Sequence, residues 1–426
     1  MLDPRSLESR RDEIAESIRK RRARGDLSGA IDAYRVSSDV QTRLNDANRE
    51  RNEHQKAGKR KLDDAERGAH NDEGRRLKEV VNQLEQELRD ARSRLDEAAA
   101  SLPNFLHPSV PEGGEEDFTT LSTWGEPTSF DFEPLDHLQI GAKLDLFDFD
   151  GGAKVAGTKF YFLKNDAVLL ELGLQRFALD RAMARGFTPV ITPDLARPAI
   201  LEGTGYSPRG EETQIYSVEG HDLCLVGTAE VTLGGLQADE LLDEAALPIK
   251  HVGLSHCFRT EAGAAGRESK GLYRVHQFTK VEMFVTCRPE DSEAIHDEMR
   301  EIEETVFRDL EIPYRVIDVA SGDLGAPAYR KFDIEAWMPG RGEAGDYGEV
   351  TSASNCTDYQ ARRLKARFKR AATKKNELAH TLNGTAIAIA RSLIPLLENH
   401  QQADGSVRIP SALQRYVGKD VLEPRA

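Results

Sequence analysis

Residues 257–284 read CFRTEAGAAGRESKGLYRVHQFTKVEMF, and this stretch decides the fold of the larger part of the chain. Its two ends have the residue composition of β-strands, while its middle is a polar segment rich in glycine and alanine. We therefore predict a strand, a loop and a second strand. Arg259 and Glu261 end the first arm, and Glu282 lies within the second.

Two further stretches place a charge inside an apolar run. Glu230 interrupts GTAEVTLGG (227–235), and Arg391 interrupts NGTAIAIARSLIPLLEN (383–399). A buried charge costs several kcal/mol unless it is paired or liganded. Two interpretations stay open: a structural ion-pair network, or a cleft whose arginines hold carboxylate or phosphate oxygens and whose glutamates hold an ammonium group or a metal. The second suits a zwitterionic substrate beside a polyphosphate.

The pattern from residue 120 onward predicts an α+β domain. Amphipathic helical stretches (169–185 and 291–310) alternate with short β-rich runs (222–228, 281–287 and 314–320). No Gly-x-Gly-x-x-Gly segment opens a helix after a strand, and no P-loop motif occurs, so these two nucleotide-binding folds are unsupported. We expect a mainly antiparallel sheet flanked by helices.

The first hundred residues have the composition of long helices. A heptad seam runs through Leu77, Val81, Leu84, Leu88, Ala91, Leu95 and Ala98, and an earlier seam through Val40, Leu44, Ala47, Arg51 and His54 becomes polar as it advances. The segment GAHNDEG (68–74) contains two glycines and predicts a turn between the two seams. The predicted structure is therefore an antiparallel helical hairpin that forms a long coiled coil. Prolines after residue 102 end it. The predicted domains are 1–102, a linker 103–120, and 121–426.

Charge is distributed unevenly along the chain. The net charge is −15, yet residues 1–100 carry 23 basic and 22 acidic side chains, against 35 and 51 in residues 101–426. The polar end of the predicted hairpin holds a basic group that suits contact with a phosphate backbone: Arg49, Arg51, Lys56, Lys59, Arg60 and Lys61. A solvated coiled coil that serves dimerisation is the alternative, and the heptads alone favour it.

Composition excludes several classes of protein. No apolar run approaches the roughly 20 residues that span a bilayer, and the charged N-terminus does not resemble a signal peptide. Four widely spaced cysteines form no zinc-ligand pattern, so we expect a reduced cytosolic protein without structural zinc and without membrane contact.

Five ordered motifs in this chain closely resemble those of seryl-tRNA synthetases, which are class II aminoacyl-tRNA synthetases. RGFTPVITPDL (185–195) is similar to motif 1 at the dimer interface, residues 257–284 to motif 2, and residues 383–410 to motif 3. TAEV (228–231) resembles the serine-binding segment, and YGEVTSASNCTDYQARRL (347–364) the adenylate-site strand. The N-terminal hairpin resembles the arm with which this family grips tRNA. The resemblance covers essentially the whole chain.

The resemblance implies a role for each matching residue. Serine would be bound by Thr228, Ala229, Glu230, Glu282 and Thr385, with Glu230 near its ammonium group and Glu282 and Thr385 around its hydroxyl. ATP would be bound by Arg259, Thr260, Glu261, Val275, Phe278, Glu349, Val350, Thr351, Ser352 and Arg391. Within that set Phe278 would stack on adenine, Arg259 would contact the α-phosphate, and Arg391 the γ-phosphate. Glu349 and Ser352 would hold the Mg²⁺ that accompanies ATP.

The function that the resemblance implies is an ATP-dependent serine–tRNA ligase. It would form seryl-adenylate from L-serine and ATP and transfer the seryl group to tRNA(Ser), and also to tRNA(Sec), as a cytoplasmic homodimer. Two alternatives stay open: a paralogue for antibiotic resistance or for biosynthetic supply of seryl-tRNA, and a non-catalytic RNA-binding relative. The charged residues of the motifs are intact, which argues against the non-catalytic alternative.

Overall fold

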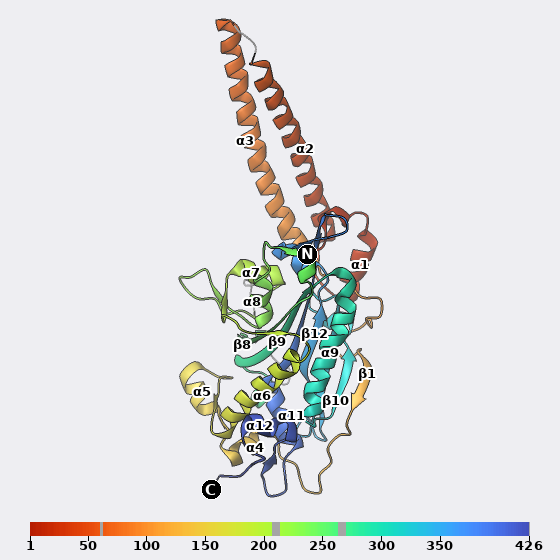
Figure 1. The fold of residues 1–426 in the computed structure, drawn as a ribbon, viewed down its shortest axis with the longest axis vertical. Helices are drawn as coiled ribbons and strands as arrows, with labels where there is room; N and C mark the ends of the chain where they lie inside the picture. Colours follow the sequence, from red (N-terminus) through yellow and green to blue (C-terminus); the bar gives the residue numbers. More distant parts are fainter. Residues whose placement is uncertain (60–62, 207–213, 263–269, 426) are drawn as a thin grey trace. The chain divides into compact units, whose positions relative to one another are not determined.

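The computed structural model describes residues 1–59, 63–206, 214–262 and 270–425. The chain divides into two compact units, residues 1–105 and residues 106–426 (Figure 1). Each unit has its own buried apolar residues. The larger unit contains the sheet, and the smaller one is helical.

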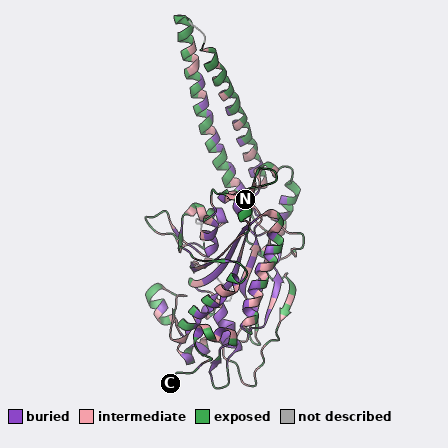
Figure 2. Ribbon diagram, viewed as in Figure 1, coloured by how far each residue is buried: buried purple, intermediate pink, exposed green. Residues whose placement is uncertain are grey.

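The smaller unit consists of η1 (Pro4–Ser6), α1 (Arg11–Lys20), α2 (Leu27–Ala57) and α3 (Asp64–Ala100). The two long helices pack along each other through the predicted apolar seam, with Val40, Leu44 and Ala47 of α2 against Val81, Leu84 and Leu88 of α3. Their outward faces are exposed (Figure 2). The prediction of a helical hairpin is therefore confirmed.

Two details of the predicted hairpin are wrong. Residues 68–74 are not a turn but part of α3, because Asp63 and Glu66 form a capping box that starts the helix earlier. The cost of a helical glycine, about 1 kcal/mol, is tolerated at Gly68 and Gly74. At the other end, Ala99 is buried in place of Ala98, since the pattern drifts relative to a strict heptad in the last turn of α3.

The larger unit is built on one sheet. Among the described residues its eight strands follow the order β1-β10-β11-β12-β15-β9-β8-β4, and every neighbouring pair is antiparallel except β4 and β8. In that order the strands are Thr119–Trp124, Tyr314–Asp318, Arg330–Met338, Asp346–Asn355, His380–Ala388, Gln277–Cys287, Ile249–Phe258 and Thr188–Ile191. This mainly antiparallel sheet, flanked by helices, confirms the predicted α+β class.

Helices pack on this sheet and complete the core. The helices are α4 (His137–Leu144), α5 (Phe149–Ala156), α6 (Asp166–Met183), α7 (Pro198–Thr204), α8 (Ala229–Gly235), α9 (Ser292–Asp309), α10 (Tyr359–Leu364), α11 (Ile389–Asn399) and α12 (Ser411–Val417). Four of them, α6, α9, α10 and α11, contact the central strand β15. Figure 2 shows that buried residues concentrate in the sheet and in the helices against it.

Short elements connect these parts. The short strands are β2 (Phe147–Asp148), β3 (Phe162–Leu163), β5 (Leu195–Ala196), β6 (Cys224–Leu225), β7 (Leu241–Asp243), β13 (Arg367–Lys369), β14 (Asn376–Leu378), β16 (Val407–Arg408) and β17 (Val421–Leu422). The 3-10 turns are η2 (Glu244–Ala246), η3 (Gly271–Tyr273), η4 (Pro289–Asp291) and η5 (Ser321–Asp323). The predicted β-rich run 222–228 is a strand only at β6, because Thr228 caps α8, and this helix carries Glu230.

Candidate active site

A cavity of about 790 Å³ lies against the central strands of the large sheet. Its lining comes from β9, β11, β12 and β15, from η3, and from the start of α11. Most of the predicted site residues line this one cavity although they are up to 161 positions apart in the sequence: Glu230, Arg259, Glu261, Val275, Phe278, Glu282, Glu349, Val350, Thr351, Ser352, Thr385 and Arg391.

Glu230 lies in the first turn of α8, where it is 6% exposed. Its Oε1 accepts hydrogen bonds from Gln360 Nε2 (2.6 Å) and Asn383 Nδ2 (2.9 Å), and its Oε2 accepts one from the hydroxyl of Tyr206 (2.9 Å). Burial, reinforced by the nearby carboxylate of Glu282, raises the pKa of Glu230 to about 7. A buried carboxylate with only neutral hydrogen-bond donors around it is suited to hold a cationic ligand group.

Glu282 lies next to this site on β9 and is 2% exposed. The Thr385 hydroxyl donates to Glu282 Oε2 (3.0 Å) from the neighbouring strand β15, where the two residues face each other in the ladder. Lys280 Nζ lies 2.6 Å from the same carboxylate oxygen. The lysine compensates the buried charge, so the carboxylate remains able to accept from a ligand hydroxyl.

Arg259 follows β8 directly and enters the cavity beside the ring of Phe278, with 5.3 Å between the guanidinium carbon and the ring centroid. Its Nε donates to the carbonyl oxygen of Gly227 (3.4 Å), and no carboxylate of the described residues lies within ion-pair distance of it. Glu261, by contrast, is paired with Arg274 (2.7 Å). Arg259 is therefore a cation whose charge is available to an anionic ligand.

Arg391 lies in the first turn of α11, with its Nη1 3.1 Å from Glu349 Oε1. Its guanidinium carbon is 4.9 Å from the ring centroid of Tyr273. Burial alone would raise the pKa of Glu349, but the charges of Arg391, Lys331 and Arg259 outweigh burial and hold that pKa below its usual value. Glu349 is consequently an anion at neutral pH, and this end of the cavity combines cations with one fixed carboxylate.

Glu349 and Ser352, predicted as metal ligands, both line the cavity and both belong to β12. Among the described residues no group of three or more His, Cys, Asp or Glu side chains is arranged to hold a metal ion. A metal at this position would therefore depend on ligand oxygens for most of its coordination.

Three predicted site residues are not among the described residues that line the cavity: Thr228, Ala229 and Thr260. Thr228 is fully buried, and its hydroxyl accepts from the Glu230 backbone N–H (3.2 Å), which fixes the start of α8. Ala229 packs with Leu233 and Phe284. Thr260 donates its backbone N–H to the carbonyl of Gln214 (3.1 Å). The structure thus places Thr228 and Ala229 behind the wall that carries Glu230.

The polar residues of the cavity that were not predicted include Tyr206, Lys280, Lys331 and Asn383, as well as Gln214, Tyr273, Arg274 and Ser354. A signal for the two lysines exists in the sequence. Each stands two positions before an acid in a strand, as Lys280 before Glu282 and Lys331 before Asp333, and residues two apart share a face of a strand. Both pairs do form, at 2.6 and 3.2 Å. For Tyr206 and Asn383 the sequence holds no comparable signal.

The predicted basic group of the hairpin lies at the end of α2. Arg49, Arg51 and Lys56 belong to the second half of this helix, and Lys59 follows it. Arg49 is paired with Asp46 (3.1 Å) but remains largely exposed. The other two members, Arg60 and Lys61, lie outside the described residues.

Comparisons with known proteins match both units. A family model described as the seryl-tRNA synthetase N-terminal domain matches residues 1–106, and one described as the tRNA synthetase class II core domain (G, H, P, S and T) matches residues 214–400. A serine–tRNA ligase of Treponema denticola is 51% identical over 99% of this chain and 99% of its own length. This chain belongs to the seryl-tRNA synthetase family. A serine–tRNA ligase of Rhodopirellula baltica is 52% identical over 99% of this chain and 100% of its own.

Solved structures of the same family share the whole fold. The seryl-tRNA synthetase of Pyrococcus horikoshii, solved with ATP, matches with a TM-score of 0.88 and 39% identity over 100% of both chains. The cytoplasmic enzyme of Naegleria fowleri, solved with AMP, matches with a TM-score of 0.85 and 32% identity over 100% of this chain and 99% of its own. In the described parts of the present chain, no helix is long and apolar enough to cross a membrane.

Proposed function

We propose that this protein activates L-serine with ATP and transfers the seryl group to tRNA. The observation that carries the proposal is the charge arrangement of this cavity, with carboxylates at Glu230 and Glu282 and cations at Arg259 and Arg391. A zwitterionic amino acid needs one charge of each sign, and a triphosphate needs several cations. Family membership and the relatives' names support the same substrates.

Serine would be recognised through three groups. Glu230 would hold the ammonium group, and Arg259 the carboxylate. The seryl hydroxyl would contact Glu282, whose other partners are Thr385 and Lys280. A site that hydrogen-bonds a substrate hydroxyl discriminates against the analogue that lacks it, because its buried polar groups would otherwise be left unpaired. Alanine is therefore the amino acid that this arrangement rejects most directly.

The activation step would be an in-line attack of the serine carboxylate oxygen on the α-phosphorus of ATP, which forms the seryl-adenylate and releases pyrophosphate. Such a step needs positioning and charge neutralisation more than a general acid or base. Arg259 would neutralise the α-phosphate, and Arg391 the γ-phosphate. Phe278 would stack on adenine, with Glu261 and the backbone near Val275 at its edge. A hydroxyl of the terminal ribose of tRNA would then attack the carbonyl carbon of the adenylate, forming the seryl ester and releasing AMP.

Mg²⁺ fits the residues at the phosphate end. Glu349 is held ionised beside Ser352 in the cavity wall, and Mg²⁺ is commonly bound by one or two carboxylates together with substrate phosphates and water. When bound, the ion would supply further neutralisation of phosphate charge. The protein residues that would hold it are Glu349 and Ser352.

The hairpin of α2 and α3 would bind tRNA. Its end carries the exposed Arg49, together with Lys56 and Lys59, and contacts of this kind position a phosphate backbone without reading its sequence. tRNA(Ser) is the substrate we propose, and tRNA(Sec) a second one.

A homodimer is part of the proposal. Its support is the resemblance of residues 185–195, which contain the edge strand β4, to the motif at the dimer interface of this family; in this strand Ile191 is 83% exposed. Because tRNA charging uses cytoplasmic substrates, we also propose a cytoplasmic location.

Serine-dependent exchange of pyrophosphate into ATP, followed by charging of tRNA, tests the proposed function. We expect both activities. Absence of serine-dependent exchange would contradict the proposal and favour a non-catalytic RNA-binding relative. Exchange without charging would instead indicate a paralogue with another acceptor.

A separate variant tests the hairpin. Arg92 Nη2 donates to Gln41 Oε1 across the two helices (2.7 Å), so joining Gln41 to Ala91 by a short turn removes the outer hairpin and keeps its base. Exchange should persist, and charging should fall by at least about a hundredfold, as expected when several phosphate contacts are lost. Normal charging by this variant would show that the outer hairpin does not hold tRNA.

A further inference from the structure

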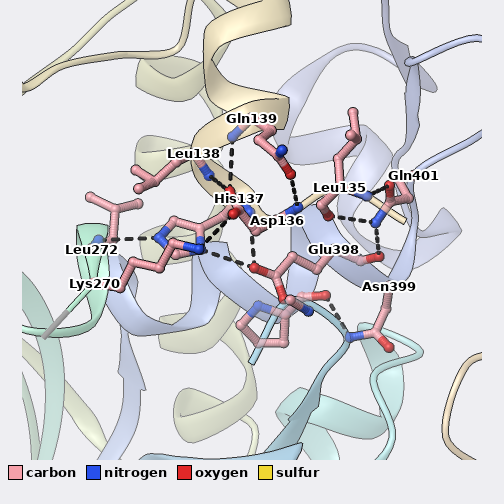
Figure 3. A network of polar contacts seen from close by, with 12 residues as sticks. Leu135, Asp136, His137, Leu138, Gln139, Lys270, Leu272, Glu398, Asn399 and Gln401 are labelled. Atoms are coloured by element: carbon pink, nitrogen blue, oxygen red, sulfur yellow. Dashed lines mark hydrogen bonds and ion pairs between the residues drawn. The ribbon is translucent and has the colours of Figure 1, made fainter. Parts of the chain in front are cut away.

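A buried carboxylate outside the cavity organises the polar contacts shown in Figure 3. Glu398, near the end of α11, is 1% exposed, and its Oε1 accepts from both the backbone N–H and the ring Nδ1 of His137 (2.9 Å each). Its Oε2 accepts from the backbone N–H of Gly340 (2.8 Å). Three N–H donors thus stabilise this carboxylate, and no lysine or arginine of the described residues lies within ion-pair distance of it. The carboxylate therefore fixes the proton of His137 on Nδ1.

The other ring nitrogen of His137 faces the turn that follows the motif 2 loop. With Nδ1 protonated, Nε2 is an acceptor, and the backbone N–H of Leu272 in η3 points to it (3.4 Å). Gly271 has a positive φ of 56°, and a Cβ on it would lie 2.2 Å from the same Nε2. Glycine at this position is therefore needed for the close approach of η3 to the imidazole.

The next residue of η3 holds the arginine of motif 3. The Tyr273 carbonyl accepts from Arg391 Nε (3.4 Å), and the Tyr273 ring has two guanidinium carbons near its centroid, of Arg391 at 4.9 Å and of Arg341 at 4.8 Å. Arg391 and Glu398 belong to the same helix and are seven residues, or about 10 Å, apart. The contacts therefore close a ring: Glu398 to His137, His137 to Leu272, Tyr273 to Arg391, and back along α11.

We propose that His137 and Glu398 are positioning residues that hold the Gly271–Tyr273 turn, and through it Arg391, in place for the terminal phosphates of ATP. The proposal rests on the proposed function. Neither residue is among the described residues that line the cavity, so both act through the turn. Because the turn and the arginine are held by one ring of contacts, loss of the imidazole acceptor lets Tyr273 and Arg391 shift together.

Two substitutions of His137 separate its two nitrogens. In His137→Asn the amide replaces Nδ1 and can still donate to Glu398, but the Leu272 N–H loses its acceptor. In His137→Gln the amide oxygen reaches the position of Nε2 and restores that acceptor. The matched control is Gln401→Ala, which removes two hydrogen bonds to the Leu135 backbone and one to the backbone carbonyl of Glu398, but leaves the contacts of the Glu398 carboxylate, the imidazole and the turn in place (Figure 3).

The readout is serine-dependent pyrophosphate exchange with ATP and serine varied separately, together with competitive inhibition by AMP, which has no terminal phosphates. We expect His137→Asn and Glu398→Gln to lower kcat/KM for ATP by roughly tenfold, with unchanged serine KM and AMP inhibition. His137→Gln should recover most of the lost kcat/KM for ATP. Gln401→Ala should leave the ratio of kcat/KM for ATP to kcat/KM for serine unchanged. An equal loss for ATP and serine, or an ATP-selective loss in Gln401→Ala, would overturn the proposal.

A measurement on the unmodified full chain still tests the proposal if the His137 or Glu398 variants fail to fold. If the turn and Arg391 are coupled, ATP should slow hydrogen exchange of the amides at 271–273 more than AMP does, by at least about threefold, because coupling between two sites is reciprocal. Equal protection by ATP and AMP would refute the positioning role even if exchange activity is normal. Absence of serine-dependent exchange by the unmodified protein would instead refute the proposed function, and the positioning role with it.

Discussion

The pKa of Glu230 makes serine binding dependent on pH near neutrality. Burial and the neighbouring Glu282 raise this pKa to about 7, against hydrogen bonds from Gln360 and Tyr206 that act in the opposite direction. A carboxyl group with this pKa is about 90% ionised at pH 8 and about 10% ionised at pH 6. The ammonium group of serine stays protonated over the same range, so only Glu230 changes its charge in this contact.

The expected result is a rise of about tenfold in the serine KM between pH 8 and pH 6, with little change in the ATP KM. The ATP KM should change less because the pKa of Glu349 is lowered and arginines do not titrate in this range, while Asp333, whose pKa burial raises, is not among the described residues that line the cavity. The assay is serine-dependent pyrophosphate exchange at saturating ATP. Calorimetry in buffers of different ionisation enthalpy should also detect release of about one proton per serine bound at pH 6, and almost none at pH 8.

Glu230→Gln is the matched control. Its amide oxygen can accept from Gln360 and Asn383, and its amide N–H can donate to the Tyr206 hydroxyl, so it reproduces the neutral acid. Its serine KM should be high and independent of pH. A serine KM of the unmodified enzyme that stays flat from pH 6 to pH 8 would refute the reasoning, and the same slope in Glu230→Gln would assign the titration to another group.

The same substitution tests the cost of the buried charge. The pKa of Glu230 is higher in the folded state than the ordinary pKa of glutamate. The contribution of this group to stability is therefore fully present below the ordinary pKa, and it is lost as pH rises through the folded-state value of about 7. The shift of this pKa from the ordinary value lowers the free energy of unfolding by about 3 kcal/mol at pH 8. Glu230→Gln should therefore unfold at a higher temperature than the unmodified protein at pH 8, with no difference near pH 4. A lower unfolding temperature at pH 8 would contradict this.

Three other substitutions test the neighbouring contacts. Thr385→Val removes a hydroxyl from Glu282 and should lower kcat/KM for serine by about tenfold while leaving the residual activity with alanine unchanged; equal losses would show that the site does not sense the hydroxyl. Lys280→Met leaves Glu282 buried without its cation and should lower the free energy of unfolding by about 3–5 kcal/mol in denaturant titrations; a change smaller than about 1 kcal/mol would contradict a stabilising role for this ion pair. Leu84→Ala should destabilise the hairpin by about 2–4 kcal/mol by circular dichroism, with normal exchange and reduced charging, and loss of exchange would contradict the separation of the two units.

The elements that the sequence predicts well are those where periodicity and burial agree. The heptads of α2 and α3 and the runs that became α6, α9, β9 and β10 lie within a few residues of their predicted bounds. The prediction fails where a single capping interaction determines the residue at which a helix begins. A single capping box at Asp63 and Glu66 moves the start of α3 ahead of two glycines, and the Thr228 cap starts α8 directly after the predicted β-rich run 222–228.

The candidate site follows a similar rule. A charge in an apolar run is expensive, so Glu230, Glu282 and Arg391 are conspicuous in the sequence, and the structure brings them to one cavity. Asn383 and Tyr206 have neutral polar side chains, which carry no such penalty and so leave no mark in the composition. His137 and Glu398 are 261 residues apart, and only the packing of α4 on α11 reveals their contact.

The cavity has a charge balance different from that of the surrounding protein. Residues 101–426 have 51 acidic and 35 basic side chains, yet the described residues of the cavity include five cations, at Arg259, Arg274, Lys280, Lys331 and Arg391, and four acids, at Glu230, Glu261, Glu282 and Glu349. Because the pKa of Glu230 is raised to about 7, its ionisation near neutral pH lowers this positive excess from two charges to one. Serine, as a zwitterion, would add no net charge, because its ammonium group would neutralise Glu230 and its carboxylate Arg259, whereas ATP brings several negative charges to the arginine end. The positive excess of the cavity therefore remains after serine binds, and it is this excess that attracts the negatively charged ATP.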